Sequence, residues 1–171
     1  SAMDIADSIC HKEEFERSLY RYLISEGVLS EDRVRIKDKD WIDVTRFSYE
    51  RFTDFMVVKR LIEKLYKKES GEFDIEVLKE RYLKDEYAAW RHKGIVESLF
   101  VQLPEATGKE LFELLPECSS YESVVDAFIE SFIWRNPEYL NDKTTDYINK
   151  YIMCYKESRN NFINSLLLIS S

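Results

Sequence analysis

The residues that could support catalysis or bind a metal are few and widely spaced. The chain has three cysteines, Cys10, Cys118 and Cys154, and two histidines, His11 and His92. The cysteines lack the Cys-x-x-Cys spacing, and neither histidine has a second His or a Cys at helical ligand spacing. The sequence also lacks the Gly-x-Ser-x-Gly elbow of many serine hydrolases. We therefore expect reduced thiols packed as small hydrophobic side chains, no metal site and no enzymatic activity in this chain.

A Gly-Lys pair, Gly108-Lys109, is the nearest approach to a nucleotide-binding loop. A Walker A loop has the form Gly-x-x-x-x-Gly-Lys-Ser/Thr. Here Leu103 stands at the position of the first glycine, and Glu110 replaces the Ser or Thr. We expect instead that Thr107 and Glu110 form a capping box at the start of a helix. The chain is thus predicted to hold no cofactor of its own.

The composition indicates a helical globular protein. Among 171 residues there are only 4 glycines and 3 prolines, too few for the turns of a large all-β fold. The net charge is −8 and basic residues alternate with acidic ones, so nucleic acid is not an expected partner. The longest apolar run is far shorter than the ~18 residues of a membrane span. Since the start does not resemble a signal peptide, the predicted location is the cytoplasm and no membrane partner is expected.

Residues 4–70 are predicted to form a partial winged helix, which consists of a helix, a β-hairpin and a second helix. Apolar residues at helical spacing place the first helix at 12–26. Alternating β-branched and aromatic residues place the hairpin near 33–47. The second helix is expected over 49–68, with Ser48 as its N-cap. In winged helices such a hairpin can touch DNA phosphate, or the module can serve for packing inside a larger protein.

Residues 71–171 are predicted to form an α-helical array, so the whole chain is expected to be mainly α. Pro104 is expected to break a helix, and Ser119 and Glu122 to form a second capping box. Ser1-Ala2-Met3 has the form of an expression scar, and the last helix ends without a cap, so we expect a fragment truncated at its C-terminal end. Helices are expected at 74–84, 86–102, 145–157 and 159–169, with further runs after Thr107 and Ser119.

One resemblance is more specific than these patterns. The segment Arg46-Phe47-Ser48-Tyr49-Glu50-Arg51-Phe52-Thr53-Asp54-Phe55, running on to Leu61, resembles the strand-to-helix segment near the end of the NACHT module in STAND-type NTPases. Four later segments resemble, in the same order, bacterial antiviral STAND ATPases of the AVAST type. These are 94–99, 102–105, 108–111 and 131–135. The resemblance covers roughly residues 12–136.

The resemblance implies a winged-helix end and a helical arm that follow an ATPase core lying outside this chain. It implies a non-catalytic regulatory and scaffold segment in antiviral defence, with ATP or ADP and Mg²⁺ bound by the full-length protein. The implied partners are the ATPase and sensor domains of the same polypeptide, with homo-oligomers formed on activation. In such proteins a winged-helix histidine can contact the nucleotide phosphate, and Tyr49 stands at the matching position. Tyrosine can donate a hydrogen bond there but carries no positive charge.

Two functions from other classes remain open at this stage. The first is a DNA-associated winged-helix regulator in which the helical region serves as a dimerisation arm. The second is a helical adaptor that binds a partner protein. Binding to mixed duplex DNA that weakens steeply with salt would favour the regulator.

Overall fold

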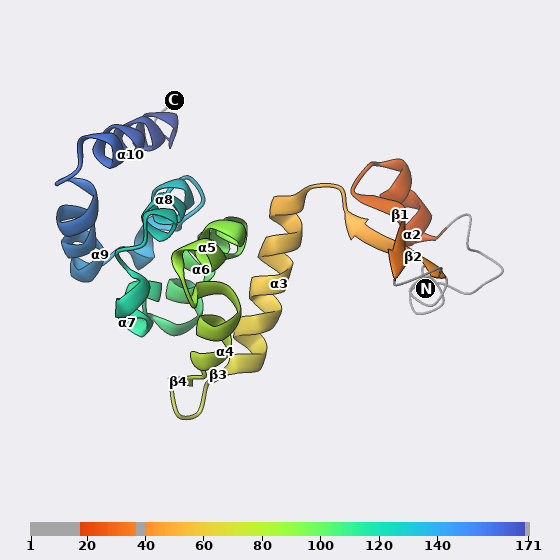
Figure 1. The fold of residues 1–171 in the computed structure, drawn as a ribbon, viewed down its shortest axis with the longest axis horizontal. Helices are drawn as coiled ribbons and strands as arrows, with labels where there is room; N and C mark the ends of the chain where they lie inside the picture. Colours follow the sequence, from red (N-terminus) through yellow and green to blue (C-terminus); the bar gives the residue numbers. More distant parts are fainter. Residues whose placement is uncertain (1–17, 37–39, 170–171) are drawn as a thin grey trace. The chain divides into compact units, whose positions relative to one another are not determined.

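The computed structural model describes residues 18–36 and 40–169. Within these residues the chain is mostly helical and runs as a helix, a β-hairpin, a helix and then a helical array, which confirms the predicted fold class (Figure 1). The chain divides into two compact units between Thr53 and Asp54, inside helix α3 (Glu50–Leu65). From the sequence, the boundary between the winged-helix module and the helical array is predicted after residue 70.

The first unit contains a short helix and the β-hairpin. Helix α2 (Leu19–Ser25) is capped by Ser18, whose side-chain oxygen accepts a backbone N–H of the first turn. The predicted start of this helix at residue 12 lies outside the described residues. Strands β1 (Leu29–Ile36) and β2 (Asp40–Phe47) pair antiparallel, so β1 begins earlier than the predicted hairpin.

Tyr20 joins α2 to both strands of the hairpin. Its side chain is fully buried, and its hydroxyl oxygen lies 2.6 Å from Glu31 Oε1 and 3.0 Å from Thr45 Oγ1. Glu31 and Thr45 face each other across the two strands, so both side chains lie on the same face of the hairpin. Burial, together with the Glu31 carboxylate, raises the pKa of the Tyr20 hydroxyl. One tyrosine therefore connects three elements of this unit.

The second unit is the helical array, seen in Figure 1 from α3 in yellow to α10 in blue. Among its described elements, η3 (Lys79–Leu83) and η6 (Ile148–Ile152) are π-helical. The elements η4 (Pro116–Cys118) and η5 (Pro137–Tyr139) are single 3₁₀ turns. After α3, the elements in chain order are β3 (Tyr66–Lys67), β4 (Glu72–Phe73), α4 (Glu76–Leu78), η3 (Lys79–Leu83), α5 (Glu86–Arg91), α6 (Lys93–Thr107), α7 (Leu111–Leu114), η4 (Pro116–Cys118), α8 (Glu122–Ser131), η5 (Pro137–Tyr139), α9 (Asp142–Tyr147), η6 (Ile148–Ile152) and α10 (Lys156–Ile169).

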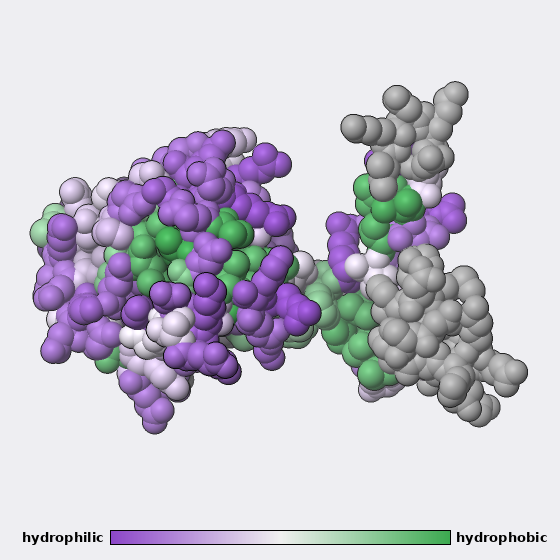
Figure 2. All heavy atoms as spheres, turned by 90° about the horizontal axis from the view of Figure 1, so that it is seen from below, coloured by the Kyte–Doolittle hydropathy of each residue, from purple (hydrophilic) through white to green (hydrophobic). Residues whose placement is uncertain are grey.

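Among the described residues, one hydrophobic core formed around α6 and α8 holds the array together. Hydrophilic residues cover most of the face of the array that Figure 2 shows. Phe100 of α6 and Phe128 of α8 are fully buried, and their rings meet edge to face at 5.1 Å. Tyr147 of α9 stacks on Phe112 at 4.4 Å, and its hydroxyl donates to the Ser119 carbonyl at 2.7 Å. Burial raises the pKa of the Tyr147 hydroxyl. Aromatic packing thus connects α6, α7, α8 and α9 in one core.

Helix α3 ends earlier than predicted because the chain turns into a second small sheet. The helix was expected to reach residue 68 but ends at Leu65. Tyr66 then pairs with Phe73, and their rings stack at 6.4 Å. The turn between β3 and β4 contains Gly71 with a φ of +68°, a conformation that glycine adopts without strain. The prediction of a single hairpin was therefore incomplete.

Pro104 does not break its helix, contrary to the prediction. It lies inside α6, which continues to Thr107. Proline lacks only its own N–H, so one bond to the preceding turn is lost while the later residues remain helical. The helix ends at Gly108, whose φ of +70° is left-handed and whose N–H donates to the Pro104 carbonyl at 2.9 Å. Gly108, rather than the proline, is the stop signal.

The first predicted capping box is displaced along the chain. Thr107 is the last residue of α6, and its hydroxyl donates back to the Leu103 carbonyl at 2.8 Å. The reciprocal box lies at the start of α7, between Glu110 and Glu113. The Glu110 N–H donates to Glu113 Oε2 at 3.0 Å. Glu110 therefore belongs to a capping box as the cap itself, and not as the partner of Thr107.

The second predicted capping box is also wrong. Ser119 donates its hydroxyl to the Pro116 carbonyl at 2.6 Å and does not cap α8. The first N–H groups of α8 instead donate to a carboxylate of α5. The Glu122 N–H lies 3.0 Å from Glu86 Oε2, and the Ser123 N–H lies 2.9 Å from Glu86 Oε1. A side chain distant in sequence thus provides the cap of this helix.

Candidate functional site

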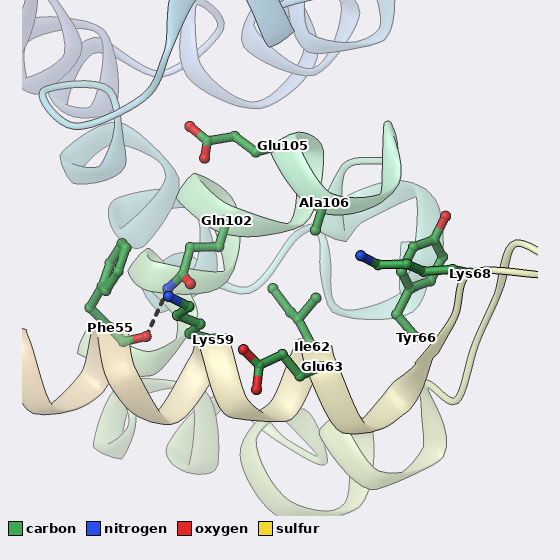
Figure 3. Close-up of a pocket in the computed structure, with 9 residues that line it drawn as sticks. All are labelled: Phe55, Lys59, Ile62, Glu63, Tyr66, Lys68, Gln102, Glu105 and Ala106. Carbon is green, nitrogen blue, oxygen red and sulfur yellow. Dashed lines mark hydrogen bonds between the residues drawn. The ribbon is translucent and has the colours of Figure 1, made fainter.

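A groove of about 500 Å³ runs between α3 and α6 in the second unit (Figure 3). Ile62 is buried, while Phe55 stands at one end of the groove and Tyr66 with Lys68 at the other. Helix α3 contributes one wall and α6 the opposite wall. The lining residues are Phe55, Lys59, Ile62, Glu63, Tyr66, Lys68, Gln102, Glu105 and Ala106.

The walls of the groove are held together by close contacts between α3 and α6. Gln102 of α6 is buried, and its side-chain Nε2 donates to the backbone carbonyl of Phe55 at 2.9 Å. Near the start of α6, a Cβ at Gly94 would overlap the carboxylate of Asp54. Glycine at this position therefore leaves room for the Asp54 carboxylate against the start of α6. Both contacts belong to the second unit, so the groove is a feature of the array itself.

The lining of the groove combines apolar and charged side chains. Phe55, Ile62 and Ala106 supply apolar surface, while Lys59, Glu63, Lys68 and Glu105 bring charges of both signs. None of the nine lining residues is a histidine, cysteine or serine. An apolar floor with a charged rim is the usual anatomy of a protein interface. Grooves that bind a helix or an extended segment use apolar surface of this kind.

A cluster of basic residues in α3 and just after it is exposed to solvent and interleaved with acidic residues; its members are Lys59, Arg60, Lys64, Lys67 and Lys68. Arg60 Nη1 lies 3.0 Å from Glu63 Oε2, and both side chains are largely exposed. Lys67 lies 3.9 Å from Glu72 across the small sheet. Such surface pairs contribute little stability and leave a surface of mixed charge. Of this cluster, Lys59 and Lys68 also reach the groove.

A second groove, of about 460 Å³, lies beside α8 and the start of α10. Asp126 lines it, and burial raises the pKa of its carboxyl despite the nearby Lys93. The Lys93 ammonium lies 4.0 Å from Asp126 and 2.8 Å from Glu130. Tyr151 lines the same groove, and its pKa is lowered by hydrogen bonds from Lys150 and Ser119. This groove is more acidic than the first and has a less apolar floor.

Tyr49, the residue predicted to contact nucleotide phosphate, belongs to the first unit. Its side chain is 71% exposed, and its backbone carbonyl accepts the N–H of Phe52 at 3.0 Å and of Thr53 at 3.3 Å. Tyr49 therefore occupies the N-cap position expected for Ser48. Packing between hairpin and helix comes from Phe47 and Phe52, whose rings meet edge to face at 4.6 Å. The nucleotide contact of Tyr49 stays a prediction.

His92 and Cys118 have packing roles, whereas Cys154 is exposed, contrary to the expectation that the thiols are packed. His92 meets the Tyr82 ring edge to face at 5.2 Å. Cys118 is buried, its thiol donates to the Leu83 carbonyl at 3.2 Å, and burial raises the thiol pKa. In the described ranges, no group of three or more His, Cys, Asp or Glu residues could hold a metal ion. Cys10 and His11 lie outside those ranges.

Two further findings concern the chain as a whole. Within residues 18–36 and 40–169, no helix has both the length and the apolar character needed to cross a bilayer. Comparison of the chain with protein-family models, with curated proteins and with solved structures finds no match.

Proposed function

We propose that the chain is a non-catalytic regulatory and scaffold module that docks onto another protein surface through the α3–α6 groove. The partner that we propose is the ATPase core of a STAND-type NTPase in bacterial antiviral defence, acting in the cytoplasm. The groove is the observation that supports docking, because it combines an apolar floor with a charged rim on two closely packed helices. The resemblance of residues 46–61 to the NACHT module supports the choice of partner.

The charges of the hairpin favour this proposal over a DNA-binding winged helix. Arg33 Nε lies 2.8 Å from Asp43 Oδ1 across the two strands. Arg46 is paired in the same way with Asp32. Both pairs are exposed, and the carboxylates offset the positive charge of the arginines, so the described part of the hairpin has mixed charge and no basic face. If the chain were a general helical adaptor, it would dock through the same groove and would differ only in the identity of the partner.

The first experiment is to read the coding sequence upstream of residue 1. A P-loop and a Walker B acid there would support the proposal, and another kind of domain would contradict the choice of partner. The isolated chain should show neither a thermal shift of several degrees with Mg-ATP nor salt-sensitive binding to mixed duplex DNA. Micromolar or tighter DNA binding that falls steeply with salt would favour the regulator.

The second experiment tests the groove directly. Ala106 is exposed on α6 and lines the groove, whereas Asn160 is exposed on α10 and does not. Ala106→Arg should weaken binding to the upstream ATPase region by about tenfold, because a guanidinium would fill the groove. Asn160→Arg adds the same group elsewhere and should leave binding unchanged. Equal affinities of the two variants, measured by calorimetry, would show that the groove is not the docking site.

A further inference from the structure

A buried ion pair connects three segments of the helical array. Glu110, before α7, is fully buried, and the Arg135 side chain, after α8, is 3% exposed. Arg135 Nη2 donates to Glu110 Oε1, and the Thr144 hydroxyl of α9 donates to the same oxygen at 2.8 Å. The guanidinium carbon lies 5.4 Å from the ring centroids of both Phe128 and Phe132. These contacts meet at the point where α9 docks on the array.

The pair is only partly satisfied by hydrogen bonds. Glu110 Oε2 and Arg135 Nη1 are both buried and have no hydrogen-bond partner among the described residues. Removing two charges from water is costly, and an incompletely bonded pair returns little net stability. A buried pair of this kind is better suited to selecting one arrangement of the segments, because any other arrangement would leave a buried charge unpaired.

The polar contacts continue from the buried pair into the first turn of α9. Glu113, which accepts the Glu110 N–H in the capping box, also forms an ion pair with Lys143. Lys143 and Thr144 are adjacent in the first turn of α9, which is capped by Asn141. Two neighbouring residues of α9 are therefore held by the two glutamates of a single capping box. This arrangement places the charged contacts of α9 on the start of α7.

We propose that Glu110, Arg135 and Thr144 form a latch that sets how residues 142–169 dock on α7 and α8. With the latch intact, α9 has one register on the array. When one charge of the pair is lost, the other remains buried without its partner, and residues 142–169 open locally while α6 and α8 stay folded. This device is a property of the chain alone and does not depend on the proposed function.

Hydrogen exchange followed by mass spectrometry tests the latch in the whole chain. Glu110→Gln and Arg135→Met should each raise the exchange rate of peptides in 142–169 by about tenfold, with little change in α6. Thr144→Val removes one hydroxyl at nearly constant volume and should raise the exchange rate by a smaller factor. Thr144→Ser keeps the hydroxyl and should exchange like the unchanged protein. Lys79→Met breaks an exposed pair with Glu117 and serves as the matched control.

The double variant Glu110→Leu with Arg135→Met separates a latch from a simple stabilising contact. It should recover the urea midpoint lost in the single variants, because no buried charge remains unpaired. Exchange in 142–169 should nevertheless stay faster than in the unchanged protein, because apolar side chains do not fix the register. The latch is wrong if the single variants speed exchange equally in all helices, if they leave 142–169 unchanged, or if the double variant restores full protection.

Discussion

Glu86 shows how one residue can stabilise a helix to which it does not belong. Its carboxylate accepts the N–H groups of Glu122 and Ser123, the first residues of α8. Glu86→Ala should lower the free energy of unfolding by about 1–2 kcal/mol, as the loss of a helix cap does. Glu86→Gln keeps one acceptor oxygen and should lose less. Urea unfolding measures both, with Glu80→Ala at an exposed position as the control; equal effects of Glu86→Ala and Glu80→Ala would argue against the cap.

The Glu113 carboxylate stabilises the folded chain at neutral pH, and this stabilisation is lost in acid. Burial raises the pKa of its carboxyl, but the Glu110 N–H and the Lys143 ammonium outweigh burial and leave the pKa below its usual 4.5. A carboxyl whose pKa is lower in the folded state than in the unfolded state stabilises the folded protein at pH values above the unfolded-state pKa. This stability is lost as the pH falls through the folded-state pKa. Glu113→Gln should therefore be less stable at neutral pH but lose less stability between about pH 5 and pH 3.

Asp126 provides a control of opposite sign for the same measurement. Burial raises the pKa of its carboxyl above the usual 3.8, so its ionised form opposes folding. As the pH falls through the raised pKa, wild-type protein gains stability from this group, and Asp126→Asn removes that gain. Urea unfolding at a series of pH values should give a shallower acid slope for Glu113→Gln and a steeper one for Asp126→Asn. Parallel slopes for all three proteins would contradict both assignments.

The variant Tyr49→Phe, which removes one hydroxyl, tests whether Tyr49 contacts a nucleotide phosphate. Because its side chain is 71% exposed, Tyr49→Phe should change the stability of the chain by less than about 1 kcal/mol. In the full-length protein the same variant should weaken the resting, nucleotide-bound state and raise basal ATPase activity. Strong destabilisation of the chain with unchanged basal ATPase would make Tyr49 a structural residue.

The candidate groove could not be predicted from the residues that form it. The sequence indicates that α3 and α6 are helices and that Lys59 lies in a basic cluster. The contact between Gln102 and Phe55, however, joins residues 47 apart, and no local pattern encodes it. The same holds for the pairing of Glu110 with Arg135. A family resemblance indicated Tyr49 as a candidate site residue. The groove, in contrast, exists only once α3 and α6 have packed together in the folded chain.

At the level of elements, Gly108 is the clearest stop signal in the array. Its φ of +70° is left-handed, and no heavy atom lies within 4 Å of a Cβ built there, so only backbone strain opposes a side chain. Gly108→Ala should lower the free energy of unfolding by about 1 kcal/mol. Gly108→Asn should lose less, because asparagine tolerates this conformation better. Urea unfolding checks the order; an alanine variant as stable as the wild type would show that α6 does not need this cap.

Helical periodicity located most elements. The errors lie at helix ends and where a predicted helix is divided, as 86–102 is at His92 between α5 and α6. Amphipathic spacing predicted α3, α6, α8 and α10, although in α10 Phe162 is buried while Ile163, Leu166, Leu167 and Leu168 are exposed. The capping predictions failed because the true partners, such as Glu86 for α8, lie elsewhere in the chain. Pro104 failed as a stop because α6 tolerates one missing bond near its end. The strands β3 and β4 have two residues each, too few to produce an alternating pattern.

Among the residues that the structure describes, the large hydrophobic core lies entirely in the second unit. The buried cluster runs from Val58 of α3 to Phe162 of α10. The first unit has a buried tyrosine and a two-stranded hairpin, and a hairpin of this size is only marginally stable alone. The stability of the chain should therefore come mainly from residues 54–171.

Truncation tests this division of the chain. A protein of residues 54–171 keeps every residue of the buried cluster, so it should unfold cooperatively in urea at nearly the same midpoint as the whole chain. A protein of residues 1–53 retains only the hairpin unit and should show weak or no cooperative unfolding. Tryptophan fluorescence of the 1–53 protein, in which Trp41 is the one tryptophan, and circular dichroism of the 54–171 protein follow the two units separately. If residues 54–171 lost cooperative unfolding, the array would depend on the hairpin unit, and a regulatory module with a separately folded docking surface would be excluded.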